Sequence, residues 1–306
     1  MATGTASEGI DVVLRDVTLR DGLQSEDPIP TSSKLDVFDA LVAAGVRELE
    51  LTSFVRPDRV PAMADAETLC HETAKKADEK GITRWGLVLN QKGAERALAA
   101  GLRHLQYVIS VSDTHSRGNA GLSTHDALEN LKKVTSAAAE ANATVEVTLA
   151  TAFGCPFEHQ IAPTQVVAAA IASAEAGATS IGLADTIGVA VPREVSTLVS
   201  AVTAGVSIPV GVHLHDTRGL GVANALAAVD QGVRRIDGSL NAFGGCPFAP
   251  GASGNVALED VAHVLEESGI STGISIDGLI EAATTAATAL GRPVASHVAV
   301  AGRRFT

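Results

Sequence analysis

The sequence has few cysteines: Cys70, Cys155 and Cys246 lie far apart and form no CxxC pair. This spacing indicates neither a disulfide framework nor a zinc ribbon, and it fits a reducing cytosol best. Aromatic residues are also scarce, at 3% of 306 residues. The apolar 46% is mostly Ala, Val, Leu and Ile, which typically fill helix–sheet interfaces and parallel strands that are buried on both faces.

Positive charge and long apolar runs are lacking as well. The formal net charge of −12 argues against extended binding to nucleic acid or to a membrane surface, because both require a basic face. A small polyanion held by a few local cations is still compatible with this charge. No run approaches the roughly 20 apolar residues that a membrane span requires. Residues 1–10 also lack the basic residues with which a signal peptide begins. We expect a soluble, unprocessed, cytoplasmic protein.

Short runs of β-branched and aliphatic residues recur along the chain, separated mostly by Ala-rich segments with helical apolar spacing. The eight runs cover residues 12–17, 46–51, 85–89, 105–111, 144–149, 180–184, 210–215 and 235–240. Gly45, Gly101, Gly177 and Gly232 each end a helical run just before the next strand, as left-handed capping glycines do. We predict an α/β fold, a (β/α)8 TIM barrel, rather than a doubly wound sheet, whose first turn would be rich in glycine.

The chain continues after Gly254 with two further helical patterns, more than the closing of a barrel requires. No linker rich in Pro, Gly or Ser separates this part from the rest. We therefore predict one domain over residues 1–306, in which residues 255–306 form a helical extension packed on the barrel. These helices would cover one end of the barrel or supply an oligomer contact, and we expect a homo-oligomer, most simply a dimer.

The segment VGVHLHDTRG at 210–219 places His213 and His215 two residues apart on an apolar run. Side chains alternate between the faces of a strand, so both imidazoles should point the same way, as in a metal site. The alternative is a pair of hydrogen-bonded or exposed histidines at a strand end. Since all eight carboxyl ends of a barrel face one rim, the other polar residues at strand ends decide between these interpretations.

The predicted strand ends supply a set of polar residues that could form a reaction centre. They are Arg20, Asp21, Glu50, Ser53, Asn90, Lys92, Asp185, His213, His215, Asp216, Asn241, Cys246 and Asn255. Two imidazoles, a carboxylate and an amide oxygen form a mixed nitrogen and oxygen set that suits six-coordinate Mg²⁺ or Mn²⁺. Catalytic Zn²⁺ sites also use two histidines and one carboxylate, so zinc stays an alternative.

Each of these residues also has a structural interpretation. Asp21 alone could be a helix N-cap, and Arg20 beside it could form a surface salt bridge instead of a clamp on a developing oxyanion. Glu50 and Asp185 could be solvated carboxylates at an edge rather than buried groups of the site. Cys246, in a glycine-rich connection, is either an inert small side chain or an accessible thiol.

Five motifs follow one another along the chain: RDGLQSE at 20–26, ELTSFVRPDRVPAM at 50–63, GLADTIGV at 182–189, HLHDT at 213–217 and GGCPFAPGASGN at 244–255. In these motifs and their order, the chain resembles the 3-hydroxy-3-methylglutaryl-CoA (HMG-CoA) lyases of the DRE-TIM metallolyase superfamily. The last motif is the most specific, because sister enzymes that condense acetyl-CoA with oxo acids share the first motif and the H-x-H but not this one. The segment DVTLRDG at 16–22, by contrast, is more similar to the condensing synthases than to the lyases.

The resemblance implies a role for each candidate residue. The implied metal ligands are Asp21, His213, His215 and Asn255. Arg20 would stabilise an enolate, Cys246 would transfer a proton, and Glu50 and Asp185 would support the site, with His213 also catalytic. Expected substrate contacts are Gln24, Ser53, Asn90 and Lys92.

The implied activity is metal-dependent cleavage of HMG-CoA, or of a close 3-hydroxy-3-substituted acyl-CoA, to acetyl-CoA and acetoacetate or the matching 3-oxo acid. Such a reaction belongs to leucine degradation. The alternatives are a condensing synthase of the isopropylmalate or citramalate type, a lyase for another 3-hydroxyacyl-CoA such as citramalyl-CoA, and a barrel retained as a binding protein. Metal-dependent turnover would separate the last alternative from the enzymes.

Overall fold

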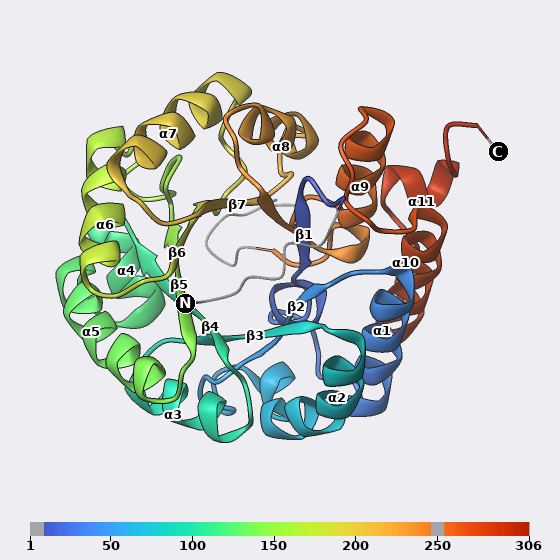
Figure 1. Cartoon of the computed structure of the whole chain (residues 1–306), viewed down its shortest axis with the longest axis horizontal. Coiled ribbons are helices and arrows are strands. Elements are labelled where there is room, and N and C mark those ends of the chain that lie inside the picture. Colours follow the sequence, from blue (N-terminus) through green and yellow to red (C-terminus); the bar gives the residue numbers. More distant parts are fainter. Residues whose placement is uncertain (1–8, 246–253, 306) are drawn as a thin grey trace.

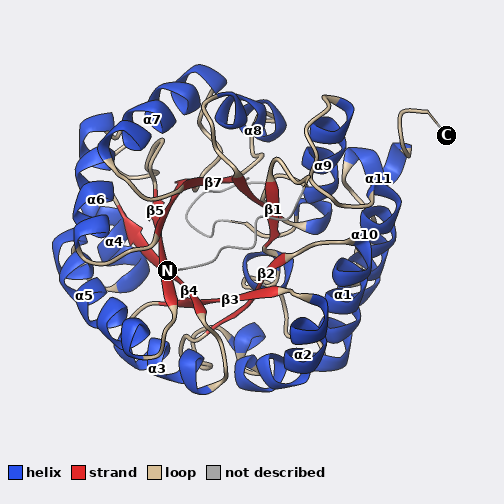
Figure 2. Cartoon of the chain, in the orientation of Figure 1, coloured by secondary structure: helices blue, strands red, loops and turns tan. Residues whose placement is uncertain are grey.

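Eight parallel strands form a closed barrel in the order β1 to β8 in the computed structural model, which describes residues 9–245 and 254–305. Figure 2 shows the strands as an inner ring and the helices outside it. The strands are β1 (Val13–Asp16), β2 (Glu48–Ser53), β3 (Thr83–Val88), β4 (His104–Ser110), β5 (Thr144–Ala150), β6 (Ser180–Asp185), β7 (Val210–Leu214) and β8 (Arg235–Gly238). Each overlaps a run predicted from the sequence, so the predicted TIM barrel is confirmed.

A helix follows each strand on the outside of the barrel (Figure 1). These helices are α1 (Thr31–Ala44), α2 (Ala66–Lys80), α3 (Gln91–Ala99), α5 (Thr124–Glu140), α6 (Pro163–Glu175), α7 (Pro192–Gly205), α8 (Gly221–Asp230) and α9 (Leu258–Glu267). A further helix, α4 (Asp113–Ala120), lies between β4 and α5. Among the residues that the structure describes, no helix is both long and apolar enough to cross a membrane.

The additional C-terminal helices expected from the sequence are present, and the first helix of residues 255–306 belongs to the barrel. Helix α9 is the helix that follows β8, so it completes the helical ring. The glycine-rich connection at 241–255 lies between this strand and this helix. Helices α10 (Ile276–Leu290) and α11 (His297–Ala301) come after it. Figure 1 shows both on the outer flank, where α10 packs against α1, so they do not cover an end of the barrel.

The predicted capping glycines adopt the left-handed conformation, as Gly45 illustrates. Its φ is +97°, and a Cβ atom there would lie 2.9 Å from the carbonyl oxygen of Gly273. Gly45 N donates to Val42 O, and Val46 N donates to Leu41 O, each at 3.1 Å. Because only glycine combines this φ with such a close approach, α1 ends here and the chain turns toward β2.

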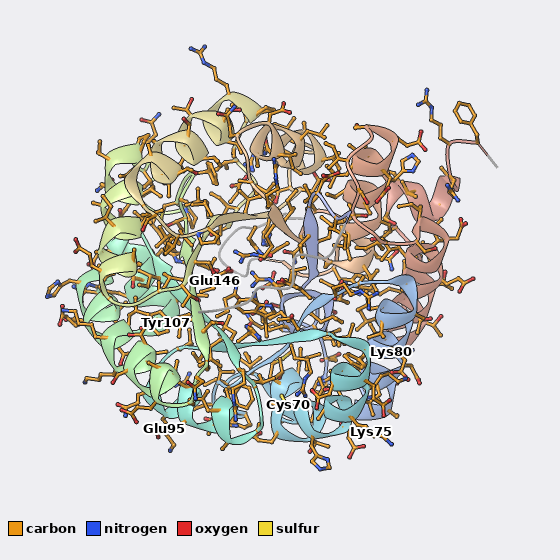
Figure 3. All side chains as sticks on the ribbon, viewed as in Figure 1. Cys70, Lys75, Lys80, Glu95, Tyr107 and Glu146 are labelled. Carbon is orange, nitrogen blue, oxygen red and sulfur yellow. The ribbon has the colours of Figure 1, made fainter. Side chains whose placement is uncertain are left out.

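The interior of the barrel is polar, although aliphatic side chains fill the layer between strands and helices. Arg15 on β1 is fully buried and its Nη2 donates to Glu146 Oε1 at 2.7 Å, and its guanidinium carbon lies 4.8 Å from the centre of the Trp85 ring. Glu146, which Figure 3 labels inside the ring of strands, comes from β5. Buried charges are costly unless they are paired, so this barrel depends on a specific ion network where many barrels have branched apolar layers.

Glu259, in the first turn of α9, is a buried carboxylate whose Oε1 accepts hydrogen bonds from Asn241 N and Ser296 Oγ, both at 2.8 Å. Its Oε2 has no hydrogen-bond partner among the described residues. Burial raises the pKa of Glu259 to about 7. Asn241, expected at the catalytic rim, instead donates from Nδ2 to Ala283 O at 2.6 Å, and it therefore anchors α10 rather than the site.

We expect the free energy of unfolding to fall as the pH rises from about 5 to 8. The unfolded glutamate ionises near its usual pKa of 4.5, whereas folded Glu259 keeps its proton up to about pH 7, so ionisation favours the unfolded chain across this window. Glu259→Gln imitates the protonated form. Thermal unfolding should show the variant melting roughly 5 °C higher than wild type at pH 8 and equally at pH 5.

The matched control is Glu267→Gln, which removes a surface carboxylate from the same helix, 37% exposed and 3.4 Å from Arg304, and should leave the pH dependence unchanged. Asp16, whose pKa burial also raises to about 7, should retain part of the pH dependence in the Glu259 variant. An equal loss of stability at both pH values would show that Glu259 is ionised in the folded protein.

Candidate active site

A cavity of about 1660 Å³ opens at the carboxyl ends of the strands. Its lining includes Asp21 after β1, Phe54 after β2, Asn90 after β3, Thr186 after β6 and His213 on β7. TIM-barrel enzymes place their active sites at this end of the barrel. The cavity is therefore the candidate active site.

His213 and His215 point the same way, as the alternation along β7 predicts. Their ring centres are 5.2 Å apart and their Nε2 atoms 3.2 Å apart. Asp21 Oδ2 lies 3.8 Å from each of these nitrogens. All three residues come from the carboxyl ends of β1 and β7, so the barrel brings together donors that are remote in sequence.

Asp21 belongs to a single turn of π-helix, η1 (Thr18–Gly22), directly after β1. Gly22 N donates to Val17 O at 3.1 Å, and the carboxylate of Asp16 accepts hydrogen bonds from Thr18 N at 2.9 Å and Thr18 Oγ1 at 2.7 Å. These contacts hold the turn against the strand. Turns of π-helix are rare in proteins, and a large share of those that do occur lie at functional sites. Here both Arg20 and Asp21 line the cavity.

Asn255, the fourth predicted ligand, joins the same cluster. It forms an isolated antiparallel bridge with His215, and its Nδ2 donates to Asp21 Oδ2 at 2.8 Å. Its Oδ1 is buried and has no hydrogen-bond partner among the described residues. A buried amide oxygen that accepts no hydrogen bond can coordinate a cation. Asp21, His213 and His215 offer three further donor atoms within 4.8 Å of one another.

The charges in this cluster favour a cation. Burial acts to raise the pKa of Asp21, but Arg20 and the two imidazoles outweigh burial and lower the pKa to about 2. Burial acts to lower the pKa of His213, but its hydrogen bond to Asp237 and the charge of Asp21 raise it. The carboxylates thus stabilise positive charge at this position, and the donor set fits a divalent metal.

Arg20 is buried, which overturns the surface salt bridge as an interpretation. Its Nε donates to Glu50 Oε2 at 2.7 Å, and its Nη1 donates to the carboxylate of Asp21. Glu50 is fully buried, and this burial raises its pKa against the opposing effect of Arg20. Glu50 is absent from the described lining of the cavity, so it orients Arg20 from behind while the guanidinium faces the cavity.

Asp185 holds a loop rather than facing the cavity. Its two carboxylate oxygens accept hydrogen bonds from Val189 N and Ala190 N, each at 2.9 Å. Thr186, the next residue, lines the cavity. Asp185 therefore shapes the connection between β6 and α7, and its predicted catalytic role stays a prediction. Asp216 caps a second loop in the same way, accepting from Gly221 N at 2.6 Å.

The four predicted substrate contacts divide into two groups. Gln24, Asn90 and Lys92 line the cavity. Asn90 Oδ1 also accepts a hydrogen bond from Gly93 N at 2.9 Å and so caps α3. Ser53 is fully buried and is not among the described residues that line the cavity. Only the first group is placed to meet a substrate directly.

Cys246 lies outside the described residues, although neighbouring Gly245 lines the cavity. The other two cysteines are buried. Burial raises the pKa of Cys70 in α2 to about 12, and Cys155 Sγ donates to Ser112 Oγ at 3.0 Å. Neither of these two buried thiols has the accessibility of a reactive cysteine.

Two groups of residues escaped the analysis of the sequence. The first is the pair Arg15 and Asp237, and Asp237 Oδ2 lies 3.3 Å from His213 Nδ1. An aspartate inside a predicted buried strand was the signal that could have revealed it.

The second group consists of cationic side chains that line the cavity beside the two that were predicted, Arg20 and Lys92. Its members are Arg56, Arg59, Arg96, Arg117 and Lys133. They come from separate helices and loops, and no sequence pattern distinguishes them.

Comparison with known proteins identifies the family. Residues 11–285 match the HMGL-like family. Hydroxymethylglutaryl-CoA lyase YngG of Bacillus subtilis is 40% identical over 289 residues, which cover 94% of this chain and 95% of that protein. The (R)-citramalyl-CoA lyase of Chloroflexus aurantiacus is 38% identical over 300 residues, covering 95% of each. Both relatives are lyases.

Solved structures with a similar fold point to the same family. An HMG-CoA lyase from Acinetobacter baumannii, in complex with coenzyme A and 3-methylmalate, superimposes with a TM-score of 0.90 at 38% identity and covers 96% of each chain. The family resemblance predicted from the motifs is confirmed. The barrel, the order of the motifs and these relatives together show that the chain belongs to the HMGL-like family.

Proposed function

We propose that this protein is a divalent-metal-dependent carbon–carbon lyase that cleaves HMG-CoA to acetyl-CoA and acetoacetate. The observation that carries the proposal is the meeting of the Asp21–His213–His215 cluster and the buried Arg20 guanidinium at one cavity. The names of two relatives, 40% and 38% identical to this chain, support it, since both are lyases and not condensing synthases. A cytoplasmic location, a role in leucine degradation and a homodimer stay predictions.

Asp21, His213, His215 and Asn255 would hold the divalent cation, Mg²⁺ or Mn²⁺. Bound there, the cation would supply Lewis acidity that lowers the pKa of the tertiary hydroxyl of the substrate. Arg20 faces the cavity, so its guanidinium can stabilise the negative enolate oxygen that develops as the two-carbon thioester departs. Glu50 keeps this guanidinium in place through the Nε–Oε2 hydrogen bond of 2.7 Å.

The cations along the cavity fit an acyl-CoA, whose phosphates are negative. Arg20, Arg56, Arg59, Lys92, Arg96, Arg117 and Lys133 line the cavity against the acids Asp21, Asp126 and Glu129. Arg59, Lys92 and Lys133 have no ion-pair partner among the described residues. Arg20, Arg56, Arg96 and Arg117 are paired with acids, so the three cations without a described ion-pair partner are the ones that would attract an anionic substrate to this cavity, in a chain of net charge −12. The structural relative from Acinetobacter baumannii was solved with coenzyme A.

A second candidate substrate is citramalyl-CoA, because the (R)-citramalyl-CoA lyase is nearly as similar as the HMG-CoA lyase. The two thioesters differ in the group on the carbon that bears the hydroxyl. Cleavage of HMG-CoA leaves acetoacetate, whereas cleavage of citramalyl-CoA leaves pyruvate.

The test is to incubate the purified protein with Mg²⁺ and a panel of 3-hydroxy-3-substituted acyl-CoA thioesters, and to measure acetyl-CoA and the oxo acid. We expect the highest kcat/KM with HMG-CoA and no product after treatment with EDTA. A higher kcat/KM with citramalyl-CoA would assign the second candidate. No acetyl-CoA from any thioester would contradict both.

Cys246→Ala should lower turnover and remove sensitivity to thiol-alkylating reagents. The reason is that Cys246 is the proposed proton donor to the enolate, whereas Cys70 and Cys155 are buried. Cys70→Ala and Cys155→Ala are the matched controls and should still be inactivated by the reagent at the wild-type rate. Inactivation of Cys246→Ala as fast as wild type would place the reactive thiol elsewhere.

A further inference from the structure

Three adjacent strands place Arg15, Asp237 and His213 in one row inside the barrel. In the pairing of β7 with β8, His213 lies opposite Asp237, and in the pairing of β1 with β8, Arg15 lies opposite the same residue. Asp237 and His213 are buried, and Arg15 is fully buried. The closure of the barrel between β8 and β1 therefore builds a continuous chain of contacts from Arg15 to a metal ligand.

We propose that Asp237 and Arg15 are positioning residues that hold His213 with its proton on Nδ1 and its Nε2 lone pair directed at the cation site. This inference rests on the proposed metal site. It adds a carboxylate and a guanidinium, neither of which touches the cation, to the residues on which metal binding depends.

The hydrogen-bonding capacity of Asp237 determines the tautomer of His213. Both carboxylate oxygens of Asp237 already accept hydrogen bonds from Arg15, so Asp237 Oδ2 is an acceptor and His213 Nδ1, 3.3 Å away, is the donor to it. A neutral imidazole with its proton on Nδ1 has its lone pair on Nε2. That nitrogen faces His215 Nε2 at 3.2 Å and Asp21 Oδ2 at 3.8 Å, where the metal ligands converge.

Arg15 holds the carboxylate of Asp237 in one orientation. Its Nε donates to Asp237 Oδ1 at 2.9 Å and its Nη2 to Oδ2 at 2.6 Å, a bidentate pair that prevents rotation of the carboxylate. Arg15 is held in turn by Glu146 and by the Trp85 ring. Lysine would keep the charge but could not form the two parallel bonds, so Arg15→Lys tests the geometry separately from the charge.

The experiment has one readout that needs neither substrate nor metal. In wild-type protein labelled with ¹⁵N-histidine, two-bond ¹H–¹⁵N correlations at about pH 9 report which nitrogen of each neutral imidazole carries the proton, and His213→Gln assigns the signals. We expect the proton of His213 on Nδ1. A proton on Nε2 in the wild-type protein would overturn the proposal.

The second readout is the affinity for Mn²⁺ alone, measured by calorimetry. Asp237→Asn should bind Mn²⁺ roughly 10- to 100-fold more weakly than wild type, and Arg15→Lys should lose affinity in the same direction by a smaller factor. Thermal unfolding of each variant identifies any loss of folded protein. If Asp237→Asn does not fold, the wild-type tautomer and Arg15→Lys still decide the question.

Glu48→Gln is the matched control. It neutralises another largely buried carboxylate in the barrel, one that accepts a hydrogen bond from Trp85 Nε1 at 3.1 Å and has no described contact with His213. It should bind Mn²⁺ as wild type does. Wild-type affinity in Asp237→Asn, or an equal loss in Glu48→Gln, would overturn the proposal. A wild-type protein that binds no Mn²⁺ but has His213 protonated on Nδ1 would contradict the proposed metal site and leave the hydrogen bond to Asp237 intact.

Discussion

His215→Ala should abolish metal-dependent turnover while the barrel stays folded. The substitution removes one of the four donors of the proposed site, and the Lewis acidity of a bound cation contributes several kcal/mol to catalysis, so we expect a loss of activity on the order of 10³-fold. The residue follows the last residue of β7 and contributes little to the aliphatic core. Turnover with Mg²⁺ and circular dichroism are the two measurements.

A thermal shift provides an independent readout of the same substitution. A ligand that binds only the folded state raises the melting temperature, so Mn²⁺ should stabilise wild type and leave His215→Ala unchanged. The matched control is His104→Ala, which removes a partly buried imidazole at the amino-terminal end of β4, its ring centre 5.1 Å from that of Trp85 in a tilted arrangement. This control should keep its response to Mn²⁺. Full activity of His215→Ala after treatment with EDTA would refute the metal assignment.

Arg20→Gln should lower kcat by about 10²-fold or more, because the proposed contact is with charge that appears only in the transition state. Glutamine keeps a hydrogen-bonding group but no positive charge for the enolate oxygen. Metal binding should persist, since Asp21 loses a competing cation and keeps its neighbours His213 and His215. Steady-state kinetics with HMG-CoA and titration with Mn²⁺ are the measurements.

Arg47→Gln serves as the comparison for this variant. Arg47 is exposed and donates to the carbonyl oxygen of Lys80 at the amino-terminal side of β2, away from the cavity, so its kinetics should match wild type. A rise in KM with unchanged kcat in Arg20→Gln would make Arg20 a substrate anchor instead of a transition-state group.

The strands were predictable because their signals are local. A run such as residues 144–149 is apolar and β-branched over its own length, and β5 covers Thr144–Ala150. A glycine at the end of a helical run predicts a positive φ at its own position, as at Gly45. The position of α9 was less accessible, because nothing in its own residues shows whether a helix closes the ring or lies outside it.

The proposed metal ligands were predictable in part for the same reason. His213 and His215 are two residues apart at the end of one extended run, so alternation alone predicts that they face the same way. The prediction that Asn241 lies at the rim was wrong. The backbone of Asn241 has a φ of +53°, and its side chain points toward α10 instead. No spacing along the chain reveals such a turn at a non-glycine residue.

The sequence by itself determined the number of βα units, the rim at which polar residues collect and the family to which the motifs belong. Each follows from patterns within a few consecutive residues. Only the tertiary structure decided that Arg15 lies against Asp237, 222 residues away, and Asp237 against His213. Periodicity determines which face of a strand a side chain occupies, but the register between strands depends on their hydrogen bonding and on closure of the barrel, and these are properties of the whole chain.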